Sequence, residues 1–163
     1  MTTLTVSELI EERKARELSE KQLDDQLKLR HKEELTEFKK RLDQFQLADW
    51  HVDAIFNQIK RAFGRGETEL MFTSFPSSFC TDNGRAINIS GEPPINEPTT
   101  DTKVREPVWL ATLPRGVLTI YAYWKDNLQS GGFGFSARII NYPGGMPGDV
   151  GLFFSWPRAA VEK

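Results

Sequence analysis

The sequence contains one cysteine, Cys80, whose thiol is the strongest nucleophile that the chain offers. A nucleophilic thiol needs a nearby base and a lowered pKa. The only imidazoles are those of His31 and His51, and both fall in segments predicted to be helical. A lone cysteine that follows a phenylalanine is more often a small buried side chain. The sequence therefore favours a structural role for Cys80 and leaves catalysis as the alternative.

The densest group of polar residues in the second part of the chain is segment 81–88. Asp82 and the following Asn-Gly pair favour an Asx turn, which Arg85 would close through a salt bridge to Asp82. The alternative is an anion- or carboxylate-binding site in which Arg85 binds the ligand. Asn88 and Arg138 would then contribute to binding, and Cys80 or Asp82 would be the reactive group.

Other chemical motifs are absent or are explained by turns. No His/Cys group has the spacing of a zinc site, and the glycine clusters at 131–134 and 143–148 lack the Lys-Ser/Thr of a phosphate-binding loop. We therefore predict neither a metal nor a cofactor. The formal net charge is −2, and the basic residues lie among acidic neighbours. We accordingly do not expect the chain to bind nucleic acid.

Two parts of different composition must position these residues. Residues 1–49 hold 10 of the 21 Lys and Arg residues and 12 of the 23 Asp and Glu residues, whereas all 12 glycines and all 9 prolines follow them. The first part is made of strong helix formers, and the second has the aromatic and turn residues of a packed domain. We predict a charged helical arm over 1–48 and a compact domain over 49–163.

The arm is predicted to be one helix from about Val6 to Gln46, and Thr5 with Glu8 matches a capping box. Apolar side chains recur every three or four residues along its second half, which is typical of a coiled coil. The predicted interface residues are Leu27, Leu35, Phe38, Leu42 and Phe45. Such a helix pairs with a copy of itself, packs on another element or partner, or is a solvated arm that frays.

The compact domain is predicted to have a small α+β fold, because helical and strand patterns alternate along its sequence. We expect a short antiparallel sheet of about three strands, covered on one face by two helices. A glycine-rich turn at 143–148 joins two strands into a hairpin, whose edge the first strand joins. The predicted elements are a helix at 49–63, a strand at 69–75, an irregular stretch at 77–106 that is mobile over about 91–103, a helix at 114–128, and strands at 133–142 and 150–156.

These features predict a cytoplasmic interaction or assembly protein. Its helical arm would bind a copy of itself or another protein, and its α+β domain would be a recognition module. One cysteine fits a reducing compartment, the N-terminus has no signal-peptide pattern, and the longest apolar stretch is too short for a membrane helix. The alternative is an enzyme that binds a small molecule or anion at segment 79–88.

Overall fold

The computed structural model describes residues 3–90 and 106–161 of the chain. It divides into two units, Met1–Arg41 and Leu42–Lys163. The sequence predicts a boundary after residue 48, whereas the structural boundary lies within the last turn of the first helix. The predicted mobile loop, 91–103, lies outside the described residues.

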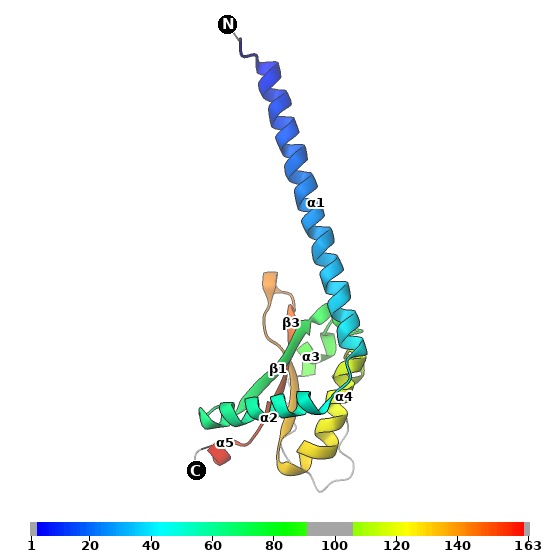
Figure 1. Cartoon of the computed structure of the whole chain (residues 1–163), viewed down its shortest axis with the longest axis vertical. Helices are drawn as coiled ribbons and strands as arrows, with labels where there is room; N and C mark the ends of the chain where they lie inside the picture. The colour runs from blue at the N-terminus through cyan, green and yellow to red at the C-terminus, as the bar shows by residue number, and fades with distance from the viewer. Residues whose placement is uncertain (1–2, 91–105, 162–163) are drawn as a thin grey trace. The chain divides into compact units, whose positions relative to one another are not determined.

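The first helix, α1, runs from Val6 to Gln44, two residues short of the predicted end (Figure 1). Its N-terminus has the predicted capping box: the N–H of Glu8 donates to Oγ1 of Thr5 at 3.2 Å, and the N–H of Thr5 donates to Oε2 of Glu8 at 3.4 Å. None of the residues of α1 is buried. Tertiary packing within the chain therefore contributes little to holding most of this helix.

The second helix, α2, spans Asp49–Gly64. The sequence predicts Asp49 as its N-cap, but the structure places Ala48 there. The alanine has no side-chain acceptor, and the cap instead uses the ring of His51, whose Nδ1 accepts the N–H of Ala48 at 2.9 Å. The helix buries Ile59 and Ala62, which lie three residues apart on one face.

Three strands form one antiparallel sheet in the order β1-β3-β2 (Figure 1). They are β1 (Glu69–Pro76), β2 (Gly134–Ile139) and β3 (Asp149–Ser155). The predicted hairpin and its edge strand are thus confirmed, although β2 ends before the predicted Tyr142. Within the turn, Gly144 and Gly145 have φ values of 61° and 80°, a region that glycine enters without steric cost.

The structure corrects two predictions about the intervening segments. The stretch predicted to be irregular contains η1 (Ser77–Phe79) and α3 (Arg85–Ser90), and a further short helix, η2 (Val108–Thr112), follows it. These helices are too short to show a 3.6-residue periodicity. The helix predicted at 114–128 is α-helical only in α4 (Arg115–Tyr123) and continues as a π-helix, η3 (Trp124–Leu128). A 3₁₀ turn, η4 (Gln129–Gly131), and a C-terminal helix, α5 (Arg158–Val161), complete the fold.

The core lies on one face of the sheet and is centred on Phe135 in β2, which is fully buried. Its ring centroid lies 5.3 Å from that of Tyr121, 5.7 Å from that of Trp124 and 6.3 Å from that of Trp109. On β3, Phe154 packs edge-on to the same ring at 5.8 Å. Aromatic contacts around Phe135 therefore help to hold η2, α4 and η3 to the sheet.

A β-bulge interrupts the pairing of β1 with β3. Met71 pairs with Phe153 and Thr73 pairs with Leu152, so Phe72 is an extra residue without a partner on β3. A bulge of this kind breaks the alternation of side chains along a strand. The ring of Phe72 stacks on that of Phe154 at 4.3 Å, on the core face. Two successive residues, Phe72 and Thr73, thus face the helices.

Candidate functional site

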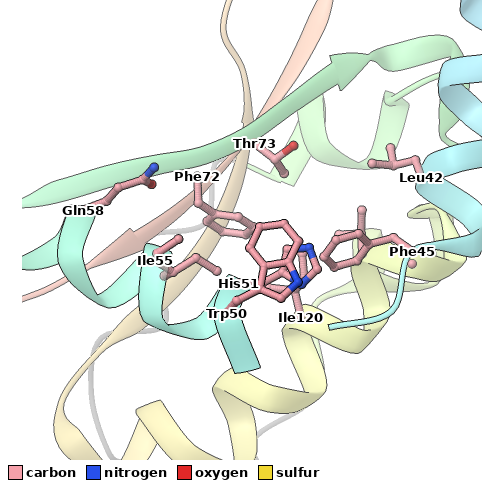
Figure 2. A pocket seen from close by; sticks show the side chains of 12 residues that line it. Leu42, Phe45, Trp50, His51, Ile55, Gln58, Phe72, Thr73 and Ile120 are labelled. Atoms are coloured by element: carbon pink, nitrogen blue, oxygen red, sulfur yellow. The ribbon is translucent and has the colours of Figure 1, made fainter. Parts of the chain in front are cut away.

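The bulge forms one wall of an apolar pocket of about 280 Å³ within the Leu42–Lys163 unit (Figure 2). Its other walls come from the last turn of α1, the segment that follows it, the first half of α2 and the first turns of α4. The lining residues are Leu42, Phe45, Trp50, His51, Ala54, Ile55, Gln58, Phe72, Thr73, Gly116, Val117 and Ile120. The pocket therefore joins three parts of the chain that are distant in sequence: residues 42–58, β1 and α4.

Three aromatic rings gather at one side of the pocket (Figure 2). The centroid of the His51 ring lies 4.7 Å from that of Phe45, edge to face, and 3.6 Å from that of Trp50. Because Nδ1 of His51 accepts the Ala48 N–H, the neutral ring carries its proton on Nε2 and can act there as a donor. The imidazole thus stabilises the turn between α1 and α2 through Nδ1, and its Nε2–H can donate to another group.

A glycine lets the end of α1 approach α4 closely. A Cβ atom on Gly116 would overlap the carbonyl oxygen of Leu42 and would lie 2.7 Å from Cβ of Phe45. The N–H of Arg115, in the first turn of α4, donates to Oδ1 of Asp43 at 3.3 Å. A carboxylate at a helix N-terminus is favourable because the free N–H groups carry partial positive charge. This contact anchors the residues that close the pocket.

The lining of the pocket is mostly apolar, with a few polar side chains. Its polar side chains include the imidazole of His51, the amide of Gln58 and the hydroxyl of Thr73, and none of the described residues that line it carries a carboxylate or a thiol. An apolar cavity of about 150 Å³ is enough to hold a benzene ring. The pocket can therefore take an apolar group of that size, with His51 and Thr73 as polar contacts.

Cys80 lies in the core, where burial raises the pKa of its thiol to about 11. The neighbouring Asp82 also raises this pKa, whereas hydrogen bonds that involve Thr112 and Gly84 oppose the rise. The thiol is therefore protonated at neutral pH, and the thiolate is the form that attacks an electrophile. This environment is that of a small buried side chain.

Asp82 caps α3. Its Oδ1 accepts the N–H of Gly84 at 3.0 Å and its Oδ2 accepts the N–H of Ala86 at 2.8 Å. The predicted Asx turn is therefore present, with backbone N–H groups rather than Arg85 as the partners of the carboxylate. Asn88 at the other end of α3 accepts a hydrogen bond from the hydroxyl of Tyr142 at 2.8 Å.

The structure does not bring Arg138 to this segment. Arg138 pairs with Gly151 in the β2–β3 ladder, which places it on the sheet face opposite Phe135 and the core. Its guanidinium forms an ion pair with Glu69 and lies 3.8 Å from the centre of the Phe153 ring. Of the predicted set, Arg138 is thus engaged by Glu69 and Phe153, and Asn88 by Tyr142.

The predicted interface residues fall into both units. Leu27 is exposed on α1, and Leu35 and Phe38 are half-buried. Leu42 and Phe45 belong to the second unit and line the pocket. Sequence reasoning missed this pocket. The aromatic sequence at 45–51 and a glycine early in a helix were its visible signals, whereas the bulge at Phe72 has none.

Comparison with models of protein families, with curated proteins and with solved structures finds no match to this chain. In residues 3–90 and 106–161, no helix combines the length and apolar composition needed to cross a membrane. The same residues contain no group of three or more His, Cys, Asp or Glu side chains that could hold a metal ion.

Proposed function

We propose that the chain is an assembly protein that associates with a second copy of itself through α1. The observation that carries this proposal is a helix of 39 residues with none of them buried. Long helices in water owe most of their stability to burial of an apolar stripe. On α1 the exposed leucines that could form such a stripe include Leu9, Leu23 and Leu27.

These three leucines share one face of the helix. Leu9 and Leu27 are separated by 18 residues, which is about five turns, and Leu23 lies about one turn before Leu27. Burying a leucine side chain contributes about 1.5–3 kcal/mol, and a symmetric pair of helices would bury each leucine twice. Pairing with a second copy would thus give Leu9, Leu23 and Leu27 the apolar contacts that their own chain does not supply.

A pair of matched substitutions tests this face. Leu27 and Leu29 are 54% and 57% exposed, but two residues along a helix correspond to a rotation of about 200°. We expect Leu27→Asp to weaken self-association of the full chain about 100-fold, because it places a charge in the apolar contact twice per dimer. Leu29→Asp is expected to change it by less than about threefold.

Sedimentation equilibrium measures both association constants, and circular dichroism checks that both variants keep the helix content of the unmodified chain. Equal association by the two variants would contradict the proposal. So would a monomeric unmodified chain. We also propose a cytoplasmic location, because a single buried cysteine suits a reducing compartment.

A second candidate function, recognition of an apolar group by the compact unit, rests on the pocket beside His51. The alternative ligand site at 79–88 has no comparable support, since the side chains of Asp82 and Asn88 are already engaged there. We expect fluorobenzene to bind the pocket and Ala54→Phe, which adds a ring to its lining, to abolish binding.

Fluorine NMR of fluorobenzene in the presence of the full chain measures this binding. Lys60→Phe is the matched control, because Lys60 is exposed on the same helix and does not line the pocket. The control is expected to bind like the unmodified chain. Equal binding by the two variants, or none by the unmodified chain, would refute the pocket as the ligand site.

A further inference from the structure

Between the leucines, the same face of α1 carries three charges. Residues at alternating spacings of four and three lie along one side of a helix. On α1 this row, which we call the α1 face, is Leu9, Arg13, Arg16, Glu20, Leu23 and Leu27. Any helix that covers the leucines must therefore also cover these charges.

The three charged residues of the α1 face differ in whether their own chain provides an ion-pair partner. Arg13 has a partner beside the face, since its Nε lies 3.6 Å from Oε1 of Glu17. Arg16 and Glu20 are four residues apart but form no ion pair among the described residues of α1. The α1 face thus presents one cation and one anion that are free to bind charges on another helix.

Parallel pairing in register would place each of these residues opposite its own copy. Arg16 would face Arg16 and Glu20 would face Glu20, and both contacts would be partly removed from water by the flanking leucines. Like charges in such contacts repel, and more strongly where water is excluded. This arrangement opposes the apolar gain from Leu9 and Leu27.

From this we infer that two copies of α1 pair in antiparallel orientation, with Arg16 of each chain facing Glu20 of the other. A two-fold axis level with residue 18 gives this match twice, as symmetry requires. The same axis places Leu9 opposite Leu27, again twice. This inference rests on the proposed self-association and adds the orientation and register of the pair.

The remaining residue pair of the face fits the same register. Arg13 lies opposite Leu23, where the aliphatic part of the arginine side chain covers the leucine while its guanidinium stays with Glu17. Glu17 lies next to the two-fold axis and near its own copy. Its charge is balanced there by Arg13 of the same chain. In this register no two like charges of the α1 face lie directly opposite each other.

Disulfide cross-linking of the full chain tests the orientation. Leu9→Cys and Leu27→Cys variants are prepared separately, and Cys80 is kept because it is buried. In the antiparallel pair identical positions lie about 27 Å apart, at about 1.5 Å per residue, which no disulfide can span. After subunit exchange and mild oxidation, we expect the mixture to form mainly dimers that join position 9 of one variant to position 27 of the other. Each variant alone is expected to form few dimers.

Cross-linking of each variant to itself would overturn the antiparallel pair while leaving self-association intact. A monomer in sedimentation equilibrium would instead refute the self-association on which the inference rests. The two failures are therefore distinguishable.

A charge exchange provides a second readout that needs no cysteine. Arg16→Glu would place a second carboxylate opposite Glu20 at both symmetric contacts, and we expect at least a tenfold loss of association. Adding Glu20→Arg restores opposite charges and is expected to recover association to within about threefold. In a parallel pair in register, Arg16→Glu would replace a contact between two arginines by a contact between two glutamates. The association constant would then change little. An unchanged association constant for Arg16→Glu, or no recovery in the double variant, would overturn the inference.

Discussion

Replacement of Phe135 by alanine is expected to lower the free energy of unfolding of the Leu42–Lys163 unit by about 3–5 kcal/mol. Phe135 is fully buried and its ring contacts aromatic side chains from η2, α4, η3 and the strand residues Phe72 and Phe154. Because these elements meet at one ring, the cavity left by alanine cannot be filled without moving several of them.

Urea denaturation followed by tryptophan fluorescence measures this loss, since Trp109 and Trp124 lie beside the ring. Val108→Ala is the control for deletion of apolar atoms, because Val108 is 79% exposed. It is expected to change the free energy of unfolding by less than about 0.5 kcal/mol. A loss below about 1 kcal/mol for Phe135→Ala, well short of the usual cost of such a cavity, would contradict the placement of the core around this residue.

The second large effect is expected from a single added methyl group. Gly116→Ala should lower the free energy of unfolding by about 2–4 kcal/mol, because its Cβ would overlap the backbone oxygen of Leu42 and crowd Phe45. Relief requires either α4 or the segment at 42–45 to move as backbone. The contact between Asp43 and the N–H of Arg115 would then lengthen or break.

Gly64→Ala is the matched control. Gly64 ends α2, and a Cβ atom there would meet nothing within 4 Å. Since alanine has the higher helix propensity and restricts the unfolded chain, this variant is expected to be neutral or up to about 1 kcal/mol more stable. Urea denaturation of both variants measures the difference. Equal stability of Gly116→Ala and the unmodified chain would show that residues 42–45 do not pack on α4.

Much of the fold could be predicted from local patterns in the sequence. A capping box and a long run without glycine or proline predicted α1 from its first residue, Val6, and alternating apolar residues predicted the hairpin of β2 and β3. The glycines of the turn at 143–148 indicated where the chain reverses. Each of these signals involves residues that are close in sequence, so the sequence alone was sufficient.

The pocket could not be predicted in the same way. It depends on an extra residue at Phe72, which arises from the pairing register of β1 with β3, and on a close approach of Leu42 to Gly116. Both are contacts between segments that are distant in sequence. The turn at Asp82 in segment 81–88 was predicted correctly, because it depends on neighbouring residues. The sheet face on which Arg138 lies follows instead from the pairing register of β2 with β3.

Sedimentation equilibrium of the unmodified full chain over a range of micromolar concentrations is the most direct examination of the role given to α1. The leucines and charges of the α1 face predict a reversible increase in mass toward two chains, with weaker association in high salt because the Arg16–Glu20 contacts are screened. The mass of one chain at every concentration would contradict the account, since no second copy would then cover the leucines of the α1 face.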